Sequence, residues 1–257
     1  MTGTKTKIAV GAGLAVLLIA GVTTLIVFRH RLEEHFNLAA GRRILAGHQA
    51  GTVDFKEVIG RRHLGTPASY FDQITSFPAW QTVPRGFQVF DQVPLQIDGM
   101  ICLWGESNAK KLKIVFPELV PDIAVHQKFQ TLYVYHGAFF TAPSGTPVCD
   151  LVFHYADGSA VTNQLLYGED ILDWVDNSKM SADGRRITPG PTAARSKLAW
   201  VGGAFSPTNK RPLRFCLTAI DNLQPDVTVT AIDLVSDKSN VAACILAMTT
   251  GRAGLMR

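Results

Sequence analysis

VCDLVFHYADGSAVTNQLLY, residues 148–167, is the stretch that decides the fold class. Its two halves, residues 148–155 and 159–167, are rich in the β-branched and aromatic residues that favour strands. Between them stands Asp157-Gly158, a pair that tolerates the positive φ angles of a tight hairpin turn. The stretch therefore predicts two antiparallel strands joined by a short turn.

Strand-like runs continue on both sides of this hairpin. Apolar residues alternate with others over residues 95–104, and further runs cover residues 129–136, 199–205, 213–219, 226–235 and 241–249. One short helix is expected over residues 168–175. Because no long helical segment separates the runs, the sequence predicts an all-β domain, an antiparallel β-sandwich of roughly eight strands.

Upstream of the strands, Ile8 to Phe28 are 21 consecutive residues without a charged side chain. At 1.5 Å per residue a helix of this length spans about 30 Å, the thickness of the hydrocarbon core of a bilayer. A cleaved secretory signal has a shorter apolar region and a small-residue cleavage site, whereas this run ends in Val27 and Phe28 and then in basic residues. We therefore expect a single N-terminal transmembrane α-helix that anchors the chain in the lipid bilayer.

The chain is expected to have four parts. Residues 1–30 form a cytoplasmic stub and the anchor, residues 31–83 a juxtamembrane helix (31–48) and a connector, residues 84–250 the sandwich, and residues 251–257 a tail. Lys and Arg flank the anchor in nearly equal number, so the positive-inside rule sets no orientation. Since long domains translocate largely regardless of flanking charge, we place the sandwich outside the cytoplasm, on the periplasmic side.

The net charge of the chain and its lack of certain short motifs exclude several classes of function. The formal net charge is +4, and Lys5 and Lys7 contribute two of these charges, which leaves about +2 for the rest of the chain. That is too little for a protein that binds nucleic acid through many phosphate contacts. No Gly-x-Ser-x-Gly elbow and no nucleotide-binding glycine loop occurs, so we expect no catalytic residue of these kinds and no cofactor.

The cysteines fall within predicted strands. They are Cys102, Cys149, Cys216 and Cys244, and no Cys-x-x-Cys motif occurs among them. We expect them to be small buried residues rather than zinc ligands. In an oxidising compartment one or two disulfides could join adjacent strands, with a connectivity that the sequence leaves open.

The candidate ligand-binding residues follow the hairpin or lie in the strands around it. Aromatic faces stack on sugar rings and carboxylates accept hydrogen bonds from hydroxyl groups, which points to Tyr167, Asp170, Asp173 and Trp174. His136 and His154 lie in successive predicted strands and could be neighbours. The alternative roles are structural: carboxylates that bond backbone amides, a buried tryptophan, and hydrogen-bonded histidines. No metal is expected, since the histidines lack metal-ligand spacing.

The longest irregular stretch of the predicted sandwich is residues 177–197, with five basic residues and two prolines. Long loops of this kind are often functional. This one could meet anionic lipid headgroups, an acidic glycan or an acidic protein face, or it could be a solvated insertion.

Five segments, taken in order, carry a resemblance to a known family. They are Val93-Pro-Leu-Gln-Ile-Asp-Gly-Met-Ile101, His136-Gly-Ala, His154-Tyr-Ala-Asp-Gly, Tyr167-Gly-Glu-Asp with Asp173-Trp174, and Ala199-Trp200-Val-Gly. Together they resemble the galactose-binding-like jelly-roll superfamily, in the neighbourhood of the NPCBM-type modules of Verrucomicrobia-like bacteria. The resemblance covers about residues 84–250 and implies a jelly-roll fold in a bacterial protein, but no particular activity.

Three functions are compatible with these observations. The preferred one is a non-catalytic, membrane-anchored interaction module that presents its loops to a protein partner or a glycan. The second is an accessory subunit of a larger membrane protein complex, in which the anchor packs against other helices. The third is a carbohydrate-active enzyme, which would need Asp170 and Asp173 as a carboxylate pair across a cleft.

Overall fold

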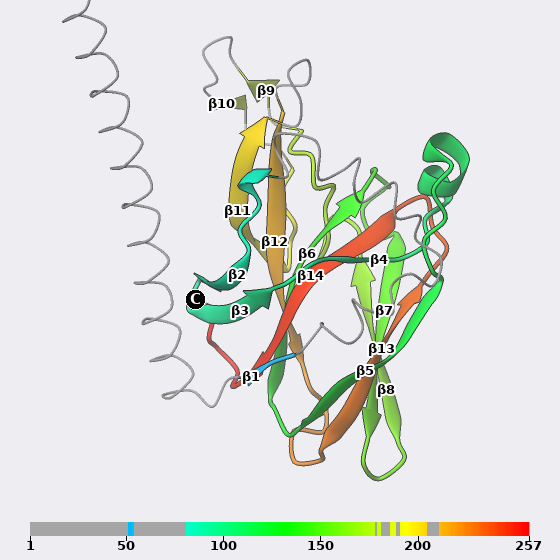
Figure 1. Ribbon diagram of the computed structural model, residues 1–257, viewed down its shortest axis with the longest axis vertical. Helices are drawn as coiled ribbons and strands as arrows, with labels where there is room; N and C mark the ends of the chain where they lie inside the picture. Colours follow the sequence, from blue (N-terminus) through cyan, green and yellow to red (C-terminus); the bar gives the residue numbers. More distant parts are fainter. Residues whose placement is uncertain are drawn as a thin grey trace, which may run out of the picture.

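The computed structural model describes residues 51–53, 81–177, 179–180, 186–188, 191–204 and 211–256. The predicted anchor, Ile8–Phe28, and the predicted juxtamembrane helix, residues 31–48, lie outside these residues. Within the described part of the chain, no helix is long and apolar enough to cross a membrane. The described residues form two main antiparallel sheets, two further two-stranded sheets and almost no helix (Figure 1), which confirms the predicted all-β sandwich.

The first sheet has the order β11-β12-β6-β14, and β14 pairs along its other edge with both β4 and β1. All of these pairs are antiparallel. The strands are β1 (Gly51–Thr52), β4 (Ile101–Cys102), β6 (Thr131–Phe139), β11 (Ser196–Ala204), β12 (Pro212–Asp221) and β14 (Ala242–Gly251). A strand from the end of the domain thus lies in the middle of this sheet.

The second sheet has the order β5-β13-β7-β8. Its strands are β5 (Leu119–Gln127), β7 (Pro147–Tyr155), β8 (Ala160–Leu166) and β13 (Val229–Ser236). The predicted hairpin is confirmed: β7 pairs with β8 up to His154 and Ala160, and Gly158 takes a φ of +86° in the turn. The backbone amide of Ser159 donates to the carboxylate of Asp157 at 2.9 Å, which closes the turn.

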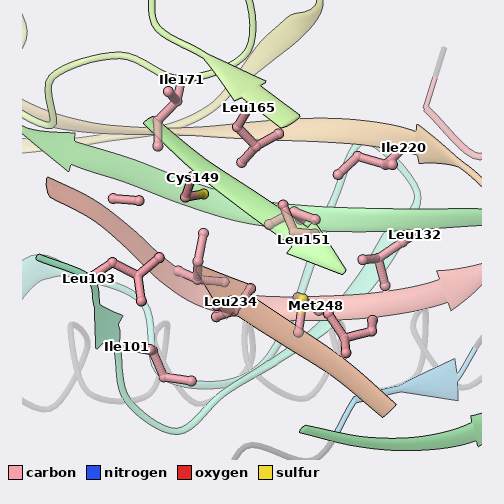
Figure 2. Packing of buried hydrophobic residues seen from close by; sticks show 14 of the residues in the cluster. Ile101, Leu103, Leu132, Cys149, Leu151, Leu165, Ile171, Ile220, Leu234 and Met248 are labelled. Atoms are coloured by element: carbon pink, nitrogen blue, oxygen red, sulfur yellow. The ribbon is translucent and has the colours of Figure 1, made fainter. Parts of the chain in front are cut away.

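The main core lies between the two sheets. Alternate residues of each strand point into it, because successive side chains of a strand face opposite sides. Figure 2 shows Leu151 and Leu234 of the second sheet beside Leu132 and Met248 of the first, all fully buried. At about 25 cal/mol per Å² of apolar surface, such side chains contribute most of the stability of the sandwich.

A separate covering layer protects the outer face of the first sheet. It consists of the hairpin of β2 (Gly86–Phe90) and β3 (Val93–Ile97) together with Ile114 and Phe116, which follow β4 in the chain. Its apolar side chains pack on those of the sheet; the Phe90 ring, for example, lies 5.2 Å from the Tyr135 ring. The second sheet differs, since exposed residues such as Ala124, Thr162 and Gln164 lie on its strands.

Three short elements complete the described fold. They are a π-helical turn, η2 (Asn108–Leu112), and the paired strands β9 (Lys179–Met180) and β10 (Arg186–Thr188). The last two lie within the predicted loop of residues 177–197, so part of that loop has regular backbone pairing.

The structure also departs from the sequence-based expectations in three places. The strand predicted over residues 95–104 is divided, because β3 ends at Ile97 and pairs with β2, whereas β4 begins at Ile101 and pairs with β14. The helix predicted over residues 168–175 is wrong: Tyr167, Ile171, Asp173 and Val175 form isolated β-bridges instead. Gly168, with a φ of +80°, turns the chain so that this segment reaches neighbouring strands. Strand β5 was not predicted. The positive φ angle of Asp122 and two register shifts against β13 interrupt the alternation of buried and exposed side chains along it.

Candidate functional site

The candidate segment, residues 167–175, is inserted between two strands of the first sheet. Strands β6 and β12 pair along much of their length and then separate. Beyond that point the Ala138 amide donates to the Leu172 carbonyl oxygen at 2.9 Å, and the Trp174 amide donates to the Ala138 carbonyl oxygen at 2.8 Å. On the other side, the Arg214 amide donates to the Trp174 carbonyl oxygen at 2.7 Å. The segment therefore replaces the missing pairing between β6 and β12.

The two aromatic candidates are buried by this arrangement. Trp174 is 5% exposed, and its ring centroid lies 4.3 Å from that of Phe139. Tyr167 is also buried, and burial raises the pKa of its hydroxyl group. Neither ring offers an open face on which a sugar could stack, so the structure agrees with the structural alternative for both residues.

Asp170 is held in a paired and buried position. Its carboxylate accepts hydrogen bonds from Arg195, from Nε to Oδ1 at 2.9 Å and from Nη2 to Oδ2 at 2.5 Å, and a third from the Leu166 amide at 2.9 Å. The Asp170 side chain is 6% exposed and that of Arg195 is 54% exposed. The carboxylate raises the pKa of the Arg195 guanidinium group. Asp170 thus joins the hairpin end to the start of β11, and its oxygen atoms are occupied by protein donors.

His136 begins a buried chain of hydrogen bonds that ends at the same segment. Its Nε2 lies 2.6 Å from Thr218 Oγ1, and Thr218 Oγ1 lies 2.6 Å from Ser196 Oγ. Ser196 Oγ donates to the backbone carbonyl oxygen of Asp170. Burial lowers the pKa of His136 to about 3, so the ring is neutral at physiological pH. These contacts connect β6, β12 and β11 beneath the inserted segment.

Asp173 lies next to a buried ion pair. Arg214 donates from Nε to the Asp173 carbonyl oxygen at 3.0 Å, and its Nη1 lies 3.6 Å from Asp176 Oδ1. The side chains of Arg214 and Asp176 are almost fully buried. The Asp173 carboxylate itself accepts the Val175 amide at 3.1 Å, and burial raises its pKa to about 6. A carboxyl group with such a pKa changes protonation state near neutral pH.

His154 is remote from His136 in the fold. It lies on β7 in the second sheet, and its Nε2 is 2.8 Å from Asp233 Oδ2 on β13. Asp233 also accepts the Asp122 amide at 2.8 Å. His136, by contrast, is on β6 in the first sheet and is fully buried. The expectation that the two histidines are neighbours is therefore wrong.

Sequence reasoning missed the residues that connect this region. Arg195 was considered only as one basic residue of a loop, and Ser196, Thr218 and Arg214 were not considered. A signal was available for Arg214, because a charged residue inside the apolar run of β12 must be paired when it is buried. Within residues 177–197, Arg195 and Lys197 are both paired; Lys197 Nζ lies 3.0 Å from Asp91 Oδ2.

Among the described residues, no group of three or more His, Cys, Asp and Glu side chains is arranged to hold a metal ion. Comparison of the chain with protein-family models, with curated proteins and with solved structures found no match. The resemblance to galactose-binding-like domains therefore stays a prediction.

Proposed function

We propose that this protein is a non-catalytic contact module, held at a bacterial membrane by one helix, whose β-sandwich binds a protein partner on the extracytoplasmic side. The observation that carries the proposal is that the candidate side chains are buried or already paired within the protein. Asp170 is paired with Arg195, His136 is buried, and Trp174 packs on Phe139. The groups best suited to chemistry or to sugar stacking support the framework instead.

The membrane part of the proposal rests on the sequence. Ile8 to Phe28 contains no charged residue and has the length that a bilayer requires. Gly11, Gly13 and Gly21 leave room for close helix packing, which also favours a second candidate function, an accessory subunit of a membrane complex. The two functions differ in whether the partner remains bound after gentle extraction.

A protein partner is favoured over a glycan by the exposed residues. Among the described residues, the large hydrophobic side chains that are well exposed are all aliphatic. Sugar-binding surfaces use exposed aromatic rings, and the described surface offers none of these, so a protein partner is the better candidate. We place the partner on the outer face of the second sheet, where Ala124 on β5 and Thr162 on β8 are exposed.

The strand order supports a jelly roll as the fold behind this surface. Without the edge strands β1 and β11, the sheets read β4-β14-β6-β12 and β5-β13-β7-β8. Along the chain, each of these strands is followed by one in the other sheet, except at the β7–β8 hairpin, and this alternation is the arrangement of two Greek keys in a jelly roll. The order agrees with the resemblance drawn from the sequence.

Membrane attachment is tested by replacing Leu17 and Leu18 with arginine in the full chain. Two charges at the centre of the apolar run cost several kcal/mol in a bilayer. We expect the parent chain to stay in the membrane pellet after alkaline carbonate extraction and the variant to be released. Release of the parent chain would contradict the anchor, and protease protection in intact cells then reports which side the sandwich occupies.

Partner binding is tested by cross-linking in intact cells, followed by purification in mild detergent. The variant Ala124→Arg with Thr162→Arg places two bulky charges on the outer face of the second sheet. Leu223→Arg is the matched control, because Leu223 is 72% exposed and lies in the turn after β12. We expect a defined protein to cross-link to the parent chain and to the control but not to the double variant. Equal cross-linking of all three chains would exclude this face.

A further inference from the structure

We propose that Cys102 and Cys244 form a disulfide bond that joins β4 to β14 beneath the covering layer. The two residues are register partners across the antiparallel pair of β4 and β14. Their Sγ atoms are 2.9 Å apart. This is closer than the roughly 3.5 Å at which even two carbon atoms lie in contact, and sulfur is the larger atom.

The backbone places the pair where a cross-strand disulfide fits. The Leu103 amide donates to the Ala243 carbonyl oxygen at 2.9 Å, so Leu103 and Ala243 belong to a hydrogen-bonded pair. In an antiparallel ladder hydrogen-bonded and non-hydrogen-bonded pairs alternate, which makes Cys102 and Cys244 a non-hydrogen-bonded pair. The Cα atoms of such pairs are about 4.5 Å apart, within the range that a disulfide spans.

No side chain lies opposite Cys244 on its second edge. On its second edge β14 pairs with β6, and the residue opposite Cys244 there is Gly137, which has no side chain. Both cysteines are buried, at 3% and 0% exposure, within the apolar cluster under the covering layer. A disulfide is apolar and removes two thiol groups, so it suits this position.

The other two cysteines are not arranged in this way. Cys149 lies on β7 in the second sheet and Cys216 on β12 in the first. The register partners of Cys149 are Leu165 and Ser236, and neither is a cysteine. Cys216 is opposite His136 and Leu198. We therefore infer one disulfide and two free thiols.

Formation of the bond requires a disulfide-bearing oxidant, such as glutathione disulfide or a thiol oxidoreductase. One cysteine thiolate attacks a sulfur of the oxidant and forms a mixed disulfide, and the second thiolate then displaces the oxidant as a thiol. The chain loses two electrons and two protons, and the oxidant gains the electrons. Because both cysteines are buried in the folded domain, where an oxidant cannot reach them and where burial also raises the pKa of the Cys244 thiol, the exchange belongs before β4 packs against β14.

The bond would secure a weak edge of the domain. Strand β4 has two residues, so few backbone hydrogen bonds hold it, yet it connects the covering layer to the sheet. In the extracytoplasmic location that belongs to the proposed function, oxidants are available and such bonds persist. The cross-link closes a loop between residues 142 positions apart, and long loops give the largest effect on the unfolded chain.

The test is thiol counting on the purified full chain, which is first reduced in the unfolded state and then refolded in mild detergent with glutathione disulfide. The chain is denatured in N-ethylmaleimide, and its intact mass and peptide map are measured with and without prior reduction. We expect two modified cysteines, Cys149 and Cys216, without reduction and four after it, with a cross-linked peptide pair that contains Cys102 and Cys244. Modification of Cys102 and Cys244 without reduction, or any other pairing, would overturn the proposal.

Variants and melting curves give an independent measure. Cys102→Ala and Cys244→Ala should each abolish the cross-linked peptide pair, whereas Cys216→Ala should retain it. Reductant should lower the Tm of the parent chain by about 5 °C or more and leave that of Cys102→Ala unchanged. If reductant left the Tm of the parent chain unchanged, the proposed disulfide would be contradicted. Thiol counting does not depend on the anchor, so its failure and a failure of carbonate extraction are separate results.

Discussion

Arg195 binds the carboxylate of Asp170 with two nitrogen atoms, at 2.9 Å and 2.5 Å, although 25 residues separate them in the sequence. Asp170 also accepts the Leu166 amide at the end of β8. The pair therefore fixes the start of the inserted segment against the start of β11. A two-point contact between a guanidinium group and a buried carboxylate is stronger and more specific than an ordinary surface ion pair.

Replacing Asp170 with Asn should lower the free energy of unfolding by about 1 to 3 kcal/mol. The amide cannot accept both guanidinium donors and the Leu166 amide, so at least one donor loses its partner. Glu169→Gln is the control, because Glu169 is 3.3 Å from Arg195 in a more exposed contact and should change stability by about 0.5 kcal/mol or less. Urea denaturation measures both. Equal losses would show that the buried contact has no special role.

His136 should make stability depend on pH in the acid range. Its pKa in the folded protein is about 3, because burial penalises the charged ring, against 6.5 for the ordinary group. The unfolded chain therefore binds the proton first, and the contribution of His136 is fully present above pH 6.5 and is lost as the pH falls toward 3. The expected slope from this residue is at most about 1.4 kcal/mol per pH unit.

Two measurements check the His136 prediction. Urea denaturation between pH 7 and pH 4 should show a shallower fall for His136→Asn than for the parent chain. In NMR spectra of the folded parent chain, the ring signals of His136 should keep the neutral form down to about pH 4. Titration of those signals near pH 6.5 would contradict the prediction.

Asp173 should have the opposite pH dependence. Burial raises its pKa to about 6 from 3.8, while the Val175 amide and Arg214 act in the other direction. Its contribution is fully present below pH 3.8 and is lost as the pH rises through 6. Asp173→Asn keeps an acceptor for the Val175 amide and removes the charge. We expect it to raise the free energy of unfolding at pH 7 by about 1 to 3 kcal/mol, with a smaller gain at pH 4.

Asp157→Asn is the matched control for Asp173. Hydrogen bonds from Ser159 lower the pKa of Asp157, so its charge is favourable in the folded turn. Removal of that charge should give no gain in stability at pH 7. If both variants were stabilised equally, a general effect of net charge would explain the gain, and the specific effect of burial at Asp173 would be refuted.

Gly137 should not tolerate a side chain. A Cβ atom there would lie 3.0 Å from the Phe215 ring and 3.3 Å from Trp174 Cβ, where the inserted segment meets β6. Gly137→Ala should cost about 1 to 3 kcal/mol through overpacking. Gly203→Ala is the control, since its new methyl group would only touch Thr82 at an ordinary 3.6 Å. Thermal denaturation should separate the two variants by several degrees.

The fold could be predicted from local patterns because each strand buries one face in a period of two. The Asp157-Gly158 turn and the runs around it were sufficient for an antiparallel sandwich. Strand β5 was missed because its alternation is broken at Asp122, where the chain takes a positive φ. The covering layer could not be predicted either. The same alternation of side chains is found in a strand whether its second face meets water or another layer of the protein.

The candidate site was only partly predictable for a different reason. The sequence identified Asp170 and Trp174 as informative residues, but their roles depend on partners that are distant along the chain. Arg195 follows Asp170 by 25 residues, and the β7–β8 hairpin separates Phe139 from Trp174 in the chain. Spacing along the chain cannot show whether a carboxylate meets solvent or a guanidinium group, which is what separates a binding residue from a structural one.

The central position of β14 has a consequence for synthesis of the protein. This strand pairs with β1, β4 and β6, and Gly51 at one end of the described chain is matched with Thr250 near the other. Until the ribosome has released residues 242–251, the backbone groups along one edge of β4 and of β6 lack their hydrogen-bond partners. The first sheet therefore closes only after residues 242–251 have left the ribosome, so the nascent domain depends on protection from aggregation, and its many long-range pairings predict slow folding.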